Sequence, residues 1–287
     1  MGEVVFAAIA PHGGMVIPEA CSPSELSLAL KTRSAMEELA HGFEQAHPQS
    51  TVVLTPHGVH VSKAMAVVTA AWLDGQLEDS ANPVRLRCPV NRQLAENVLQ
   101  ALKDRGVPVV GVSFGGNDPT ESVMPMDWGS LVPLWFLGGR QDPPVSVVAV
   151  SPARDLSTEV HLEAGRAIHD AIAASTGRVA IIASADHGHA HSAEGPYGFD
   201  PAAAVFDRRI IEILEAGELA PVSTIPGSMV ESARADSWWQ MVMLEGALGR
   251  GWRARLLSYE APTYFGMVCA DFAPVSRQGA GLAQAAP

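Results

Sequence analysis

The sequence predicts an α/β protein: a single domain with a central, mainly parallel or mixed sheet and helices on both faces. Short apolar runs typical of buried strands alternate with longer helical segments along almost the whole chain. This alternation is typical of a sheet covered by helices on both sides. No linker-like change of composition divides the 287 residues. We therefore expect one domain over residues 1–275, followed by a flexible tail over 276–287.

The expected elements follow from apolar periodicity and from helix start and stop signals. Ser22 or Ser24 can cap the first helix, and Gly106 ends the second. Polar segments rich in Gly and Pro predict loops over 115–127 and 186–200. The expected strands cover residues 4–9, 51–54, 67–73, 107–112, 145–150, 178–183, 252–258 and 266–270. The expected helices cover residues 24–46, 91–105, 129–137, 157–175, 201–217 and 232–248.

Composition excludes several classes of function. A net charge of −12 argues against binding to nucleic acid or to an anionic membrane surface, because both need clustered Lys and Arg. No apolar stretch is long enough to span a bilayer, and the first residues lack the basic region and cleavage site of a signal peptide. The three cysteines are widely spaced and form neither a zinc pattern nor a disulfide framework. We therefore expect a reduced, cytoplasmic protein.

Two similar segments point to a metal site. His12 and His57 each lie in a Pro-His-Gly sequence that directly follows an apolar strand. In open α/β sheets, ligands bind at the carboxyl ends of the strands. Imidazole is the commonest metal ligand among side chains, so the pair predicts a metal site and an enzyme.

A third histidine segment follows the expected strand over 178–183. It contains His187, His189 and His191 at alternate positions. We expect one of the three to have a chemical role and the others to support it or to face the substrate.

The expected carboxylate ligand is Glu260. If the metal is Fe(II), two His and one carboxylate on one face leave positions open for substrate and dioxygen. Glu260 ends another apolar strand, which makes it the natural partner of His12 and His57.

At this point an ordered set of motifs resembles a known family, the class III extradiol ring-cleavage dioxygenases, the superfamily of the protocatechuate 4,5-dioxygenase β subunit. The motifs span nearly the whole chain in the family's order. They are Ala10-Pro11-His12, Thr55-Pro56-His57, Asp127-Trp128-Gly129-Ser130-Leu131-Val132-Pro133-Leu134, Ala185-Asp186-His187-Gly188-His189, Phe206-Asp207 and the segment around Glu260.

The resemblance implies that His12, His57 and Glu260 hold Fe(II), and that His189 is the acid/base histidine. The alternative register gives that role to His187 or His191. The resemblance also implies cleavage of a catechol or 2-aminophenol by insertion of dioxygen. Zinc or manganese in place of iron stays open.

Several other residues are expected near the substrate. Trp128 stands where many members of the family carry a histidine, which leaves acid/base work to His189 or a neighbour and tilts the substrate away from the protocatechuate type. His60 resembles a residue often found near the substrate, and Tyr197 is expected at the mouth of the site. His187 and His191 complete the substrate-facing set.

Two other functions compete with the dioxygenase. A metal-dependent hydrolase with zinc would use the same residues. A non-enzymatic binding protein of the Memo type shares the fold, but such proteins depart from the ligand set that this chain retains. The expected partners are a small aromatic substrate and dioxygen. We also expect a homodimer, with a partner subunit as an alternative.

Overall fold

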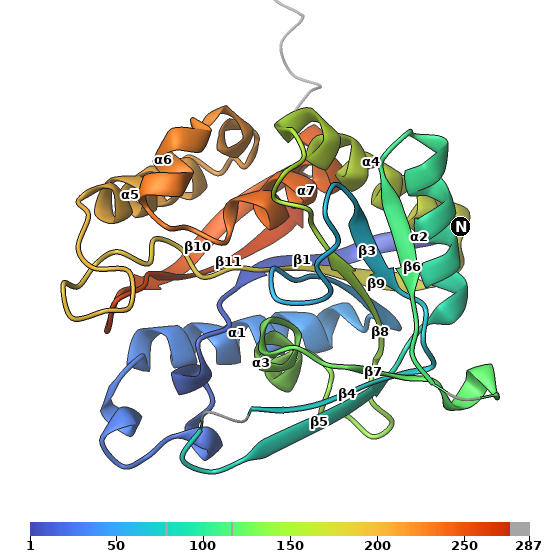
Figure 1. The fold of residues 1–287 in the computed structure, drawn as a ribbon, viewed down its shortest axis with the longest axis horizontal. Helices are drawn as coiled ribbons and strands as arrows, with labels where there is room; N and C mark the ends of the chain where they lie inside the picture. Colours follow the sequence, from blue (N-terminus) through green and yellow to red (C-terminus); the bar gives the residue numbers. More distant parts are fainter. Residues whose placement is uncertain (78–79, 116, 276–287) are drawn as a thin grey trace, which may run out of the picture.

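The computed structural model describes residues 1–77, 80–115 and 117–275, which form two sheets with helices packed around them (Figure 1). The larger sheet has eight strands in the order β10-β11-β1-β9-β2-β8-β3-β6, and the smaller has the order β5-β4-β7. The strands are β1 (Glu3–Ala10), β2 (Ser50–Leu54), β3 (Met65–Val68), β4 (Trp72–Leu77), β5 (Val84–Pro89), β6 (Val109–Val112), β7 (Val123–Pro125), β8 (Ser146–Ser151), β9 (Arg178–Ser184), β10 (Trp252–Glu260) and β11 (Met267–Pro274). The helices are α1 (Leu30–Ala46), α2 (Arg92–Asp104), α3 (Trp128–Phe136), α4 (Thr158–Ala174), α5 (Ala202–Glu215), α6 (Gly227–Ser232) and α7 (Trp238–Leu248).

Parallel pairing in the centre of the large sheet confirms the predicted fold class. β1 pairs in parallel with β9, β9 with β2, and β2 with β8, while β11 and β10 add an antiparallel edge. The central strands are almost wholly buried, as expected for a sheet covered on both faces. Because β1, β9 and β2 are neighbours with the same direction, their carboxyl ends lie together at one edge.

Helices cover both faces of the large sheet (Figure 1). α1 packs against β1, β10 and β11 on one face, and α7 and α4 pack against β9 and β1 on the other. α3 contacts both β9 of the large sheet and β4 of the small one, so it joins the two sheets. No helix in these described ranges is long and apolar enough to cross a membrane.

The small sheet was not predicted. The expected strand over 67–73 splits into β3 and β4, which belong to different sheets, because the chain turns at Ala71 and bonds to Ser122. β5 has every second residue exposed, so it lacks the continuous apolar run of a buried strand. β7 falls in the segment 115–127 that was expected to be a loop.

Two expected helices also have different bounds. The helix expected over 24–46 begins only at Leu30, after a short 3₁₀ turn at Glu25–Ser27. The helix expected over 232–248 begins only at Trp238, as α7, and Ser232 is the last residue of the separate helix α6. The tail expected over 276–287 lies outside the described residues, and the domain bounds stay a prediction.

Close packing of α4 on α7 gives a test of the fold. A Cβ added to Gly165 would overlap the Met243 carbonyl oxygen and lie 2.7 Å from the Ala247 nitrogen, both of them rigid backbone atoms. We expect Gly165→Ala to lower the free energy of unfolding by about 1–3 kcal/mol in urea titrations. Gly251→Ala is the matched control, because a Cβ there meets nothing within 4 Å. Equal stability of the two variants would contradict this account of the helix contact.

Candidate metal centre

Three neighbouring strands deliver polar side chains to one edge of the large sheet. His12 follows β1, His57 follows β2, and the segment from Asp186 to His189 follows β9, which lies between them. His12 is 2% exposed, and its backbone N–H donates to Asp186 Oδ1 at 3.0 Å. The predicted meeting of His12 and His57 at this edge is therefore observed, and their function as ligands stays a prediction.

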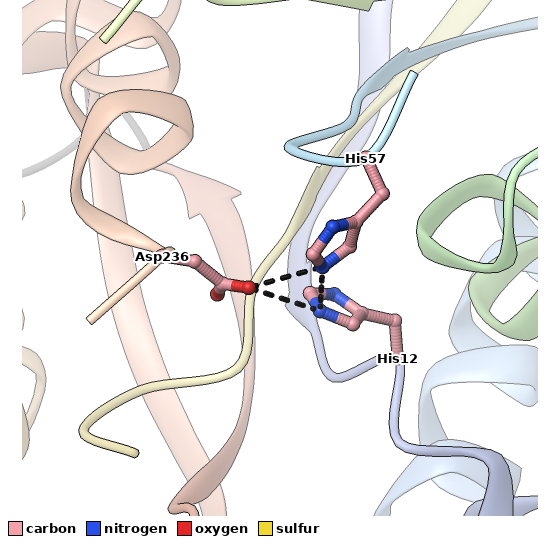
Figure 2. Close-up of side chains that lie close together, drawn as sticks. All are labelled: His12, His57 and Asp236. Carbon is pink, nitrogen blue, oxygen red and sulfur yellow. Dashed lines mark hydrogen bonds and ion pairs between the residues drawn. The ribbon is translucent and has the colours of Figure 1, made fainter. Parts of the chain in front are cut away.

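His12, His57 and Asp236 form one compact cluster (Figure 2). The Nε2 atoms of the two histidines are 3.1 Å apart. Asp236 Oδ2 lies 3.0 Å from Nε2 of His57 and 3.5 Å from Nε2 of His12. Asp236 comes from the loop just before α7, and it faces the two histidines from the opposite side of the cluster (Figure 2).

The carboxylate of this cluster is Asp236, so the expectation for Glu260 has to be corrected. Glu260 does end its strand at the predicted edge, but β11 lies between β10 and β1. Neighbouring strands are about 4.8 Å apart, so two strand steps put Glu260 roughly 10 Å from β1. Its Oε1 accepts hydrogen bonds from the backbone N–H and the hydroxyl of Thr32, both at 2.7 Å. Glu260 therefore caps the first turn of α1, where Ala29 offers no side-chain cap.

The sequence around Asp236 does contain a signal for the start of a helix. A polar Asp236-Ser237 pair directly before the apolar Trp238-Trp239 is typical of a helix start. The prediction of one helix over 232–248 did not use this signal, and it therefore placed Asp236 within a helix.

A hydrogen-bond chain fixes the tautomer of His12. The Ser184 hydroxyl donates its single proton to the carbonyl of Gly129. It must therefore accept from His12, whose Nδ1 lies 2.9 Å away. With Nδ1 protonated, Nε2 of the neutral ring carries the lone pair that faces His57 and Asp236.

Electrostatics make the cluster suited to a cation. Burial alone would lower the pKa of His12, but the carboxylates of Asp186 and Asp236 outweigh it and raise the pKa to about 9. Burial alone would raise the pKa of Asp236, but the charge and hydrogen bond of His12 and the hydrogen bond of His57 hold it well below its usual range. Burial, followed by the charge of His12, lowers the pKa of His57. Positive charge at Nε2 of His12 is thus stabilised by buried carboxylate.

The donor set fits a divalent metal ion. Bonds of about 2.0–2.2 Å from a metal to His nitrogen and carboxylate oxygen put neighbouring ligand atoms about 3.0–3.5 Å apart. The three separations in the cluster match this spacing. Asp236 Oδ1 is buried and has no hydrogen-bond partner among the described residues, so its carboxylate keeps coordinating capacity. Two His and one carboxylate suit Fe(II), and they also suit zinc.

Of the three alternating histidines, only His189 reaches the cavities next to the cluster. Its Nδ1 lies 2.6 Å from the His187 carbonyl oxygen, so Nδ1 donates and Nε2 is left as the basic atom. Its ring stacks on Phe265 and meets Tyr197 edge-on. His189 therefore presents a defined proton acceptor beside the cluster.

His187 and His191 have structural contacts instead, and neither lines the two cavities at the cluster. His187 is fully buried, its Nδ1 lies 3.0 Å from the Ser237 hydroxyl, and burial lowers its pKa. His191 Nε2 lies 2.8 Å from Oδ2 of the buried Asp207, whose Oδ1 accepts from the N–H of Gly188. Asp207 thus holds the loop that carries His189.

The other predicted substrate neighbours do lie at the cavities. Trp128 stacks on His57 with ring centres 4.2 Å apart, and it lines the larger cavity. Tyr197 is 57% exposed and borders both cavities. His60 is exposed and lines the smaller one. Their contacts with a substrate stay a prediction.

Fold and site together define an α/β protein with a buried His–His–carboxylate cluster at the carboxyl edge of its sheet. A family model described as the catalytic LigB subunit of aromatic ring-opening dioxygenase matches residues 6–270. The chain belongs to this family.

Two known proteins are similar over most of the chain. Protein CA_C1420 of Clostridium acetobutylicum is 25% identical over 252 residues, which are 87% of this chain and 53% of that protein. The chain therefore spans about half the length of this curated relative. The crystal structure of the uncharacterized protein JW3007 from Escherichia coli K12 superposes with a TM-score of 0.60 at 18% identity, covering 93% of this chain and 99% of that one. This second likeness supports the fold alone.

A matched pair of isosteric variants tests which carboxylate belongs to the metal centre. We expect Asp236→Asn to lose stoichiometric binding of Fe(II) or Zn(II), because a neutral amide replaces the buried charge. Glu260→Gln should bind metal like the parent, since its carboxylate faces Thr32. Metal content after dialysis and titration calorimetry measure both. Loss of metal in Glu260→Gln with retention in Asp236→Asn would reverse the assignment.

Proposed function

We propose that this protein is a non-heme Fe(II)-dependent extradiol dioxygenase, which cleaves the ring of a catechol or 2-aminophenol by inserting both atoms of dioxygen. The observation that carries this proposal is the His12–His57–Asp236 cluster at the base of a cavity with aromatic walls, in a chain of the ring-opening dioxygenase family. A ferrous ion supplies a redox-active Lewis acid with open coordination positions when it is bound by such a set.

The residues around the cluster divide the remaining work. The ring of the substrate would lie between Trp128 and the Tyr264–Phe265 pair, which supply flat apolar surfaces on the cavity wall. Nε2 of His189 would accept a proton from a ring hydroxyl and later return it to an oxygen of the product. An imidazole suits both steps because its ordinary pKa lies near neutral pH. The indole of Trp128 cannot accept and return a proton as an imidazole does. Its proposed role is to form part of the cavity wall and to cover the ring of His57.

Oxygen consumption tests the activity directly. Protein loaded anaerobically with Fe(II) should consume one dioxygen for each ring cleaved when it is given catechols and 2-aminophenols, and it should form a yellow ring-opened product. Zinc-loaded protein is the control, because zinc has no redox chemistry. Binding of catechols with no oxygen uptake by the iron form would contradict the proposal. Hydrolysis by the zinc form would favour the metal-dependent hydrolase.

His189 gives a second test that separates chemistry from metal binding. We expect His189→Gln to keep its iron and its affinity for catechol, and to lose about 10²- to 10⁴-fold in kcat, the range for removal of a general acid/base. His41→Gln is the control, because His41 is an exposed residue of α1. Full activity of His189→Gln would assign proton transfer to another group.

The expected homodimer or partner subunit stays a prediction, to be checked by light scattering on the active sample.

A further inference from the structure

Two cavities meet at the metal-ligand cluster, and they differ in access to it. The larger has a volume of about 1400 Å³ and is bordered by all three residues of the cluster. The smaller, of about 900 Å³, is bordered by His57 and Asp236 but not by His12. Cavities of about 300–1,000 Å³ suffice for drug-sized ligands, so the larger one holds much more than a single aromatic ring. A substrate that reaches the full ligand set therefore has room for an extended ring substituent in the larger cavity.

The wall of the larger cavity is rich in carboxylates. Glu25 and Asp74 border it away from the cluster, whereas Asp127 and Asp186 border it beside the cluster, where Asp186 contacts His12. Asp127 accepts hydrogen bonds from Thr55 and Ser130, and Glu25 accepts from Ser22. These donors are neutral, so they satisfy the oxygens and leave the negative charge in place.

The part of the chain that the structure describes places one cationic side chain at this cavity, and that side chain is paired with a carboxylate. Among the described residues that border the larger cavity, Arg85 is the only Arg or Lys. Its Nε and Nη2 donate to the two oxygens of Asp74, each at 2.8 Å, across the β4–β5 pair of the small sheet. Such a bidentate pair has no net charge, so it attracts a carboxylate of a ligand much less than an unpaired guanidinium would.

We propose that the ring substituent of the substrate lies along the small sheet and is uncharged or cationic, and that Asp74 sets this specificity by neutralising Arg85. The inference rests on the proposed function, since it assumes that an aromatic diol or aminophenol meets the cluster. A carboxylate at the end of the substituent would face the carboxylate of Glu25 and the neutral Asp74–Arg85 pair, and no unpaired Arg or Lys is among the described residues that border the cavity. An ammonium or amide group there would face carboxylate oxygens that can accept its protons.

The smaller cavity carries charges of both signs, because Glu159 and Glu231 border it as well as two arginines. Arg154 and Arg234 border it, and among the described residues neither makes an ion pair. Arg154 stacks over Trp239 instead. An anionic substituent on this side would find two arginines in the cavity wall, which makes them the natural comparison in a test.

Equilibrium binding of three matched ligands tests the proposal without turnover. The ligands are catechols with a three-carbon chain at ring position 4 that ends in ammonium, primary amide or carboxylate. Calorimetry on zinc-loaded protein, at low salt, should rank affinity in that order. We expect Asp74→Asn to strengthen carboxylate binding relative to amide binding by about fivefold, the upper range for a partly exposed ion pair. Arg85→Gln should have the opposite effect, and strengthen binding of the ammonium ligand relative to the amide ligand.

The outcomes separate the two proposals. If unsubstituted catechol binds and is cleaved by the iron form but the three ligands bind equally, the specificity inference is wrong and the dioxygenase stands. If carboxylate binds best and Arg154→Gln or Arg234→Gln removes that advantage, the substituent lies in the smaller cavity and the inference is overturned. If none of the catechols binds to metal-loaded protein, both proposals fail. The melting temperature of each variant checks that Asp74→Asn and Arg85→Gln fold.

Discussion

The parallel pairing of β1, β9 and β2 is the constraint on which the site depends. Because side-by-side parallel strands end at the same edge, three loops that are far apart in sequence converge there. His12 and His57 come from the outer two strands, and Asp186 and His189 follow the strand between them. A slip of one residue in either pairing would turn a ligand loop away from its partners. The buried apolar strands therefore fix the position of the cluster as well as the core.

Local hydrogen bonds then set the chemistry of each ring. Ser184 ends β9, and its hydroxyl lies between the Gly129 carbonyl of α3 and Nδ1 of His12, so the position of α3 decides which nitrogen of His12 is protonated. The carbonyl of His187 has the same effect on His189. In both cases a backbone oxygen defines the proton acceptor, and backbone moves less than a side chain. Nε2 of both rings is thus kept available without any further acid or base.

The local part of this arrangement could be predicted from sequence, and the non-local part could not. Pro-His-Gly after an apolar run is a local pattern, and it placed His12 and His57 correctly at strand ends. Glu260 also ends an apolar strand, but the order of strands in a sheet depends on pairing between distant segments, and β11 separates Glu260 from the cluster. Asp236 lies in a loop between two helices rather than at a strand end, so the pattern of polar residues after apolar strands does not predict it. The small sheet was missed because β5 is half exposed and β7 is very short.

The small sheet borders the same cavity as the cluster but takes no part in the cluster itself. The large sheet and its loops supply the cluster, whereas β4 and β5 supply a wall of the cavity that contributes no ligand. Changes on that wall are therefore free of the constraints that hold the cluster. The Asp74–Arg85 pair joins the neighbouring strands β4 and β5 of the small sheet, so either residue can change without disturbing β1, β9 or β2. Under the proposed function, substrate choice would depend on the small sheet and metal binding on the loops that carry His12, His57 and Asp236. The charge of the wall would then vary without a change in the chemistry of the cluster.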